Sequence, residues 1–438
     1  MNKKELREAR DCLEAFLGPL LPSLGRLERR RWGVFYVQGL LLEGGRKTAA
    51  GMAERFGGNV QALQQFVSQS PWDWVPVRQA LAIETVRLAS SRAGWILDDT
   101  GFPKKGTNSV GVARQYSGTL GKVGNCQIGV SLNYATDEGC FPLDFQLYLP
   151  KEWTNDPSRC QKAGIPRDVT FKRKWELGIQ MIDQAREWDI PAGVIVADAG
   201  YGVATEFRTE LHDRKLLYVV GITNDVHVWQ GDVEILPPDY PGRGRPRKYP
   251  VELPSDDSVL EVAKNLPDDS WLQITWREGQ KGPLTGRFAA VRVQPSHGPK
   301  RRRNIFDPVQ WLLVEWPLTA PEPTKFWLSN LPEGTLLKDL IYWAKLRWWV
   351  EQNYQQLKDD LGLDHFEGRS WTGWHHHVTL TMIAFNFLVT EGFRSKKNFW
   401  VDPPTRQEGT ATDAIDPTWF LPDLPEPRSP FLQLKLGP

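Results

Sequence analysis

Apolar residues in the first ninety positions recur with the spacing of amphipathic helices. Residues 6–21 and 32–42 carry this pattern, and residues 47–68 indicate two short helices around a Gly-Gly break. Several short helices with basic residues suit a DNA-binding module, so we expect residues 1–90 to form a helical N-terminal DNA-binding domain. A helical cap packed on a catalytic core is the alternative, because the break at 47–68 is too generic to name a helix-turn-helix.

Strand patterns begin near residue 94. Short apolar runs at 94–99 and 193–198 both end in acidic residues, and two alternating segments at 126–135 and 141–149 predict a hairpin. Helical patterns at 171–189 and 203–214 and an apolar strand at 216–222 complete the series. This order predicts an α/β fold with a mixed sheet flanked by helices, and residues 91–223 would be the first part of its catalytic core.

The pattern changes in residues 224–310, where Pro, Gly, Asp and basic residues separate short alternating segments. We interpret this region as a β-rich insertion. Core-like strands return at 311–316 and 325–330, followed by a long helix from about residue 336 and a strongly apolar helix at 374–393. Residues 311–395 would therefore be the second part of the core, and residues 396–438 a Pro-rich irregular tail.

Composition narrows the class of protein only slightly. The 438 residues are 40% apolar and 24% charged, as in ordinary globular proteins, and the net charge of +1 gives no overall argument for nucleic acid. Four cysteines without a CxxC pair fit a reducing cytoplasm. The charged N-terminus lacks a signal-peptide core, and no apolar run approaches a membrane span. We expect a soluble cytoplasmic protein with no membrane contact.

Residues 342–358 predict one long helix that carries Arg347, Glu351 and Lys358. At about 100° per residue, these three side chains return to nearly the same face. An acid between two bases, beside Trp348, is unusual for a helix that serves only to pack. An intrahelical ion pair between Arg347 and Glu351 is the structural alternative.

Three acidic positions could together form a metal site. Asp98 or Asp99 ends one strand-like run, Asp198 ends another, and Glu351 lies on the long helix. A single strand-end Asp is usually a turn or cap residue, but three acids in this order suit a divalent-metal nuclease. Two Mg²⁺ ions can activate an attacking oxygen and stabilise the leaving one in phosphoryl transfer. We expect Mn²⁺ to be able to substitute for Mg²⁺.

Several longer motifs carry a family resemblance. Residues 98–106 (DDTGFPKKG), 111–132, 197–202 (ADAGYG) and 363–377 resemble one subgroup of the DDE transposases of bacterial insertion sequences. In the branch with a β-rich insertion, the last acid lies in a Tyr-x2-Arg-x3-Glu-x6-Lys signature. Arg347, Glu351 and Lys358 match its spacing, whereas Ala344 stands at the Tyr position and Tyr342 lies two residues earlier. The resemblance covers about residues 30–395 and implies an RNase H-like catalytic domain.

The first acid of the site has two candidates. Neighbouring residues on a strand point to opposite faces, so only one of Asp98 and Asp99 should face the metals. An Asp-Asp/Glu-Thr-Gly pattern in related sequences favours Asp98. Other branches place Thr directly after the acid, which favours Asp99. We take Asp98 as the metal-binding acid and keep Asp99 as the alternative.

The resemblance also implies DNA-binding roles. Arg347 and Lys358 would hold phosphates near the cut, and Trp348 would stack a flipped base or else belong to the core. Basic residues in loops are further candidates for phosphate contacts, with a solvated surface as their alternative: Lys104, Lys105, Arg114 and Lys122. Residues 242–248 resemble a minor-groove hook built on Arg243, Arg245 and Arg247, or a flexible basic linker.

Three adjacent histidines, His375, His376 and His377, invite a zinc interpretation. Consecutive residues on a helix point in different directions and no Cys lies near them, so we expect DNA contact or helix surface instead.

The resemblance implies an enzyme that binds the terminal inverted repeats of its element, cleaves double-stranded DNA at the ends and joins them to target DNA. One site can serve both steps, because each is an in-line displacement at phosphorus. The branch suggests cut-and-paste through a hairpin, by a homodimer on paired ends in the bacterial nucleoid. The alternatives are a transposase-derived DNA-binding protein, a metal-dependent nuclease without strand transfer, and a glycosidase with paired carboxylates.

Overall fold

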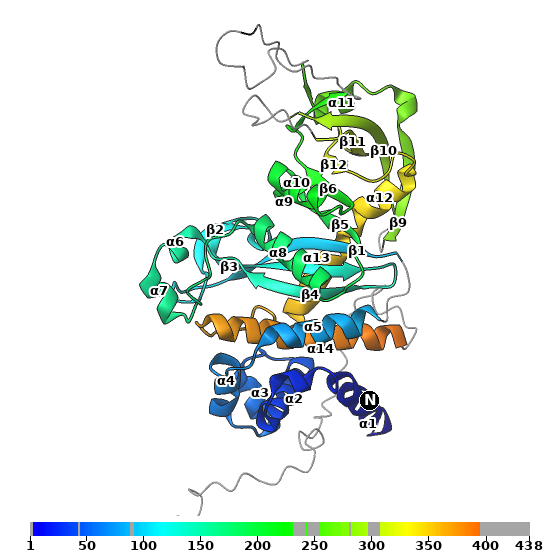
Figure 1. The fold of residues 1–438 in the computed structure, drawn as a ribbon. Helices are drawn as coiled ribbons and strands as arrows, with labels where there is room; N and C mark the ends of the chain where they lie inside the picture. The colour runs from blue at the N-terminus through cyan, green and yellow to red at the C-terminus, as the bar shows by residue number, and fades with distance from the viewer. Residues whose placement is uncertain are drawn as a thin grey trace, which may run out of the picture.

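The computed structural model describes residues 3–42, 44–87, 92–230, 242, 255–279, 282–296 and 307–394 (Figure 1). The predictions for Arg243, Arg245 and Arg247 and for the tail at 396–438 lie outside these residues. No helix in the described ranges combines the length and apolar character that a membrane crossing requires.

Five helices form the N-terminal part: α1 (Lys3–Leu17), α2 (Leu27–Leu41), α3 (Ala49–Phe56), α4 (Val60–Ser68) and α5 (Trp74–Val86). The Thr48 hydroxyl caps α3 and the Asn59 side chain caps α4, each accepting a hydrogen bond from a backbone N–H in the first turn. Gly57, at φ +67°, ends α3 in the left-handed conformation that favours glycine. The predicted pair of short helices at 47–68 is confirmed.

A mixed sheet forms the centre of the molecule. Its first strands are β1 (Gly94–Pro103), β2 (Ala113–Ser117), β3 (Lys122–Ala135), β4 (Cys140–Leu147), β5 (Val194–Ala197) and β6 (Tyr218–Ile222). β1 pairs with β3 antiparallel and with β5 parallel, and β5 pairs with β6 parallel. The predicted hairpin is β3–β4. The predicted fold class, an RNase H-like α/β sheet flanked by helices, is confirmed.

The sheet continues without a break into the later strands. β6 pairs antiparallel with β12, and the order runs on through β11, β10, β7 and β8, with β9 beside β10. These strands are β7 (His227–Gln230), β8 (Asp257–Ser258), β9 (Leu272–Gly279), β10 (Gly282–Pro295), β11 (Gln310–Pro317) and β12 (Lys325–Ser329). The predicted β-rich region therefore shares one hydrogen-bonded sheet with the core, through β12 and β11.

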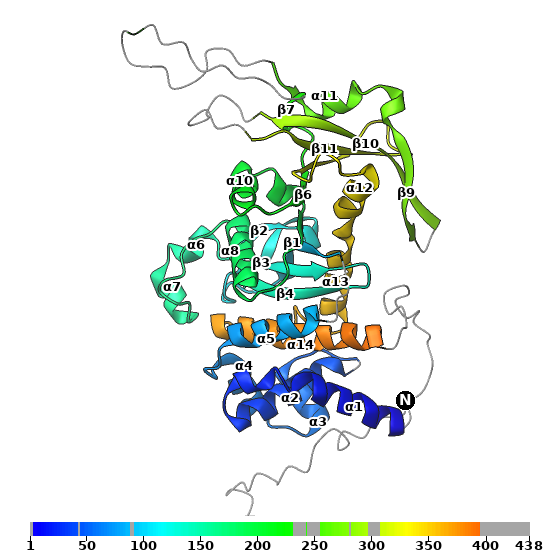
Figure 2. The ribbon, with the colours of Figure 1, turned by 45° about the vertical axis from the view of Figure 1, so that its right-hand side comes forward.

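Helices cover both faces of this sheet. α8 (Lys174–Glu187) packs on β3 and β4, whereas α12 (Leu337–Leu346) contacts β1, β5 and β6. α14 (Trp371–Arg394) and α5 lie side by side between β4 and the other N-terminal helices (Figures 1 and 2). The remaining helices are short: α6 (Lys151–Thr154), α7 (Pro157–Lys162), α9 (Ala199–Gly202), α10 (Thr205–Asp213) and α11 (Val259–Lys264).

Two expectations about the C-terminal helices are wrong. The predicted single helix at 342–358 is two helices, α12 and α13 (Trp348–Asp359), with Arg347 at the junction between them. The three histidines are not on the surface, because α14 is buried on every side there and all three are fully buried. His377 hydrogen-bonds the Tyr36 hydroxyl at 2.8 Å, and His376 contacts the backbone carbonyls of Val67 and Trp72. The histidines therefore join the N-terminal helices to the core.

Candidate active site

The two adjacent acids of β1 point to opposite faces of the sheet. Asp98 faces α12 and α13, because the Arg347 guanidinium lies 2.6 Å from its Oδ2. Asp99 faces α8, where Lys174 Nζ lies 3.0 Å from its carboxylate and the Tyr201 hydroxyl donates to it at 3.2 Å. The strand alternation used in the sequence argument is thus realised, and the two carboxylates have different partners.

Asp198 lies beside Asp98 because their strands are parallel neighbours. Leu97 of β1 is paired with Ala197 of β5, and each acid directly follows its paired residue. Asp198 also caps α9, accepting a hydrogen bond from the Gly200 N–H at 2.9 Å. The cap and the strand pairing together fix where this carboxylate points.

Glu351 reaches the same place from α13. Its carboxylate lies 2.5 Å from Arg347, whose other terminal nitrogen contacts Asp98. The intrahelical pair considered in the sequence argument is therefore formed, but the same guanidinium also bridges to the strand. Glu351 is 60% exposed at its side chain and Asp98 only 9%, so the site has a buried floor and an open side.

Burial dominates the electrostatics of the two aspartates. It raises the pKa of Asp98 to about 7, against the attraction of Arg347, and the negative charge of Asp198 adds to the rise. Burial likewise raises the pKa of Asp198, again opposed by Arg347. The negative charge of Asp99 also raises the pKa of Asp198. Carboxylates whose negative charge is destabilised by burial and by neighbouring acids are a setting in which a bound cation is favourable.

Carboxylate oxygens are the ligands that hard divalent cations prefer, so the donor set fits a metal. Across the described ranges, no three His, Cys, Asp or Glu side chains are close enough together to hold an ion as they stand. Arg347 lies between Asp98 and Glu351, so metal binding by both acids requires this guanidinium to move aside.

Residues 19–283 match the family described as DDE superfamily endonuclease. The chain belongs to this superfamily. It is also 26% identical, over 325 residues, to a protein of Microchaete diplosiphon described as a probable transposase for the insertion sequence element IS701, with 73% of this chain and 72% of that relative covered. The predicted family, an insertion-sequence DDE transposase, is confirmed: the chain is a metal-dependent enzyme that acts on DNA. The family match includes Asp98 and Asp198 and ends before Glu351.

A cavity of about 380 Å³ adjoins two of the three candidate acids, Asp198 and Glu351. Asp198, Arg347 and Glu351 line it together with the predicted base-stacking residue Trp348. Its other walls include Trp276 of β9 and Trp327 of β12, so the strands that continue the sheet also shape the candidate active site.

The Trp348 side chain is half-buried and contacts two other side chains. The Arg277 guanidinium lies 3.3 Å from the centre of its ring, and the neighbouring Trp349 ring stacks at 4.2 Å. A cation over an indole face is a favourable contact of about 1 kcal/mol. A base that stacked on this face would have to displace Arg277.

The two predicted phosphate-binding lysines nearest the site donate to backbone carbonyls. Lys358 donates to Gly101 at 2.9 Å, and to the Thr119 hydroxyl at 3.1 Å. Lys104 donates to Phe366 at 2.8 Å and to Asp364 at 3.3 Å, so it holds the segment after α13. The other predicted phosphate ligands of this region are exposed: Lys105, Arg114 and Lys122.

Sequence reasoning missed the residues that support the acids from a distance. Lys174 lies 75 residues from Asp99, and no local pattern connects them. Lys345 forms a buried pair with Glu315 at 2.6 Å and faces the Trp276 ring at 4.5 Å, which ties α12 to the later strands. Of the residues that contact Asp99, only Tyr201 could have been found from the sequence, because it lies in the ADAGYG motif.

Proposed function

We propose that the enzyme binds the terminal inverted repeats of its insertion sequence, cleaves the DNA at both ends and joins the freed ends to target DNA. Asp98, Asp198 and Glu351 are its catalytic carboxylates in this proposal. The observation that carries it is the bridging Arg347, which contacts Asp98 at 2.6 Å and Glu351 at 2.5 Å although one acid is on a strand and the other on a helix.

The choice of Asp98 over Asp99 is supported by the opposite faces of β1. The Asp99 carboxylate accepts hydrogen bonds from Lys174 of α8 and from the Tyr201 hydroxyl, on the face of β1 opposite Asp98. Asp98, Asp198 and Glu351 would hold two Mg²⁺ ions, or Mn²⁺ in their place. Bound ions supply activation of the attacking oxygen and stabilisation of the leaving oxygen in phosphoryl transfer.

Arg347 has a second role in this proposal. Where the acids held metal ions, its guanidinium would no longer be needed as their counterion, and its planar fork would suit bidentate contact with a DNA phosphate. Lys358, Lys105, Arg114 and Lys122 contribute phosphate contacts around it, and Trp348 receives a base drawn out of the duplex.

The proposal extends to how the element ends are bound and paired. Residues 1–90 and 242–248 bind the repeats, the latter through Arg243, Arg245 and Arg247, and Lys104 positions the segment after α13. Two copies of the chain on paired DNA ends carry out cut-and-paste transposition, with a hairpin at each excised end. The protein acts in the cytoplasm, on the DNA of the nucleoid.

The test is cleavage of a labelled duplex that carries the native element end, with Mg²⁺ or with EDTA. We expect Mg²⁺-dependent cutting by the wild type and a loss of at least about a hundredfold in Glu351→Ala, because a metal ligand is removed. DNA binding should be retained. Glu333→Ala removes an exposed Glu from a turn before α12 and is the matched control.

Addition of target DNA then tests strand transfer. Cutting without joining would support a nuclease. End binding without any cutting by the wild type would favour a transposase-derived DNA-binding protein and contradict the proposal.

A further inference from the structure

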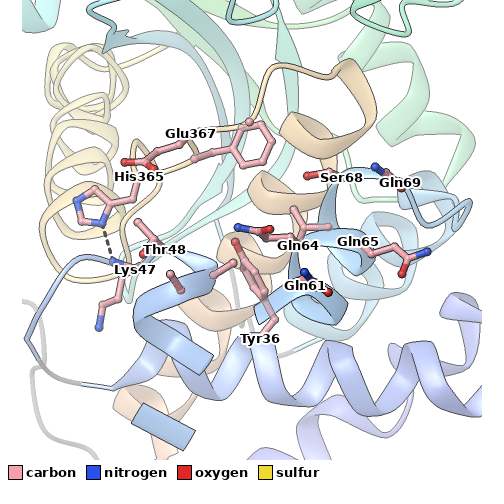
Figure 3. A pocket seen from close by; sticks show the side chains of 15 residues that line it. Tyr36, Lys47, Thr48, Gln61, Gln64, Gln65, Ser68, Gln69, His365 and Glu367 are labelled. Atoms are coloured by element: carbon pink, nitrogen blue, oxygen red, sulfur yellow. Dashed lines mark hydrogen bonds between the residues drawn. The ribbon is translucent and has the colours of Figure 1, made fainter. Parts of the chain in front are cut away.

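A polar groove lies between the N-terminal helices and the segment after α13. Its volume is about 690 Å³. Glutamines line one side, and His365 and Glu367 line the other (Figure 3). Lys47 donates its backbone N–H to His365 Nδ1 at 3.1 Å, so the two walls are joined at one end. None of the proposed catalytic acids lines this groove.

The glutamines belong to one face of α4. Gln61, Gln64 and Gln65 follow the spacing i, i+3, i+4 and are all exposed. The opposite face is apolar, and its residues are buried in the core: Leu63, Phe66 and Val67. Packing therefore fixes the rotation of the helix and presents three carboxamides to solvent.

These carboxamides are available for recognition. Within the described residues, none of the three has a side-chain hydrogen bond to another residue. A carboxamide presents one acceptor and two donors, which matches the N6 and N7 edge of adenine in the major groove. A face meant only for solubility would more commonly carry Lys or Glu, so three uncharged amides favour the reading of base edges over simple solvation.

The backbone around α4 fits entry into a groove. α3 and α4 are separated by three residues, including Gly57 in the left-handed conformation, and α2 packs against both. In helix-turn-helix proteins the second helix of such a pair lies in the major groove. The same arrangement places the glutamines on the solvent side of the second helix.

Basic residues flank the groove. Arg46 and Arg369 are exposed and adjoin the lining residues Lys47 and Gly368 in the sequence, and Arg46 forms a 3.0 Å pair with the exposed Glu367. An exposed pair of this kind contributes little stability, so a DNA phosphate can replace Glu367 at low cost. Positive charge at the rim and neutral amides at the centre match a duplex, whose phosphates flank its base edges.

We propose that α4 enters the major groove of duplex DNA and that Gln61, Gln64 and Gln65 read base edges there, with a preference for adenine. This inference rests on the proposed binding of element ends and adds the residues that determine which sequence is bound.

The test is selection of binding sites by the full-length protein from duplexes with a randomised centre. We expect the wild type to enrich one motif that contains A·T pairs. Gln61→Ala/Gln64→Ala/Gln65→Ala should lose at least about tenfold of the preference for that motif over random duplex, because each amide-to-adenine contact supplies discrimination of that order. Its affinity for random duplex should stay within about threefold of the wild type, since the phosphate contacts remain. Gln161→Ala, at an exposed position on α7, is the matched control.

A triple variant that selects the same motif with the same preference would overturn the proposal, and so would a wild type that selects no motif. The wild type and the triple variant are compared by thermal unfolding, so that a folding defect is recognised. Mg²⁺-dependent cleavage of the selected duplex is measured separately. A motif read by the glutamines without any cleavage would leave this inference standing while the proposed catalytic function fails.

Discussion

Asp98→Asn should remove from the metal-free protein a loss of stability that occurs as the pH rises through neutrality. Burial raises the pKa of Asp98 to about 7, from an ordinary value of about 3.9. Between these two values the folded protein holds the proton more tightly than the unfolded chain does. The free energy of unfolding therefore falls as the pH rises, and this stabilising contribution is lost as the pH passes the folded-state pKa.

The size of the effect follows from the two pKa values. Between about pH 5 and about pH 8, ionisation of Asp98 should lower the free energy of unfolding by about 2.5 kcal/mol. Asn has nearly the same shape as Asp and does not ionise in this range. The variant should escape that loss, apart from a constant difference that arises from its altered contact with Arg347.

Urea unfolding in EDTA at several pH values measures this directly. The difference in unfolding free energy between Asp98→Asn and wild type should grow by about 2.5 kcal/mol from pH 5 to pH 8. Asp168→Asn, at an exposed loop position, should show no such trend. A difference that stays constant with pH would refute the argument, because Asp98 would then ionise in the folded protein as readily as in the unfolded chain.

Two further substitutions test buried ion pairs by urea unfolding. Arg78→Ala leaves the buried Asp144, its partner at 2.6 Å, without a counterion and should cost about 3–5 kcal/mol, whereas the exposed Arg87→Ala should cost under about 1 kcal/mol. An equal cost for both would contradict the role of burial. Burial lowers the pKa of Lys345 to about 8, so the folded protein releases this proton at a lower pH than the unfolded chain. The free energy of unfolding of wild type relative to Lys345→Met should then rise by about 2 kcal/mol between about pH 8 and pH 10, and a flat difference would contradict the burial of this charge beside Glu315.

The acids at strand ends could be predicted because their signal is local. An apolar run followed by Asp draws attention to both Asp98 and Asp198, and the alternation of a strand places Asp98 and Asp99 on opposite faces. Asp198 does follow the end of β5, whereas the prediction that β1 ends at the acids is wrong, because the strand continues to Pro103. The register that brings Leu97 opposite Ala197 is set by residues a hundred positions apart, so their proximity required the structure.

The break at Arg347 could not be predicted from periodicity. The apolar spacing from 342 to 358 is that of a helix throughout, and it placed Arg347, Glu351 and Lys358 on one face. The helix is instead interrupted at Arg347 alone, where the backbone keeps right-handed helical angles (φ −59°, ψ −22°) and the guanidinium contacts the buried Asp98.

The histidines and Lys104 show the same limit for polar residues. Sequence reasoning assigns polar side chains to the surface, yet His375, His376 and His377 are buried. Backbone carbonyls and the Tyr36 hydroxyl satisfy both ring nitrogens of His376 and His377, whereas only the Nδ1 of His375 has a partner, Arg78. Lys104 is adjacent to the exposed Lys105, but its ammonium donates hydrogen bonds to two backbone carbonyls more than 250 residues away in the sequence. Contacts between residues so far apart in the sequence produce no local sequence pattern from which they could be predicted.

The pairing of β6 with β12 also bears on the order in which the parts of the candidate site are completed during synthesis. During synthesis β6 emerges with one edge unpaired, and its neighbour β12 follows only after about a hundred more residues, since Ile222 pairs with Phe326. Glu351 emerges later still. A ribosome-bound chain therefore carries Asp98 and Asp198 without Glu351, and under the proposed function a product that ends before Glu351 would not cut DNA.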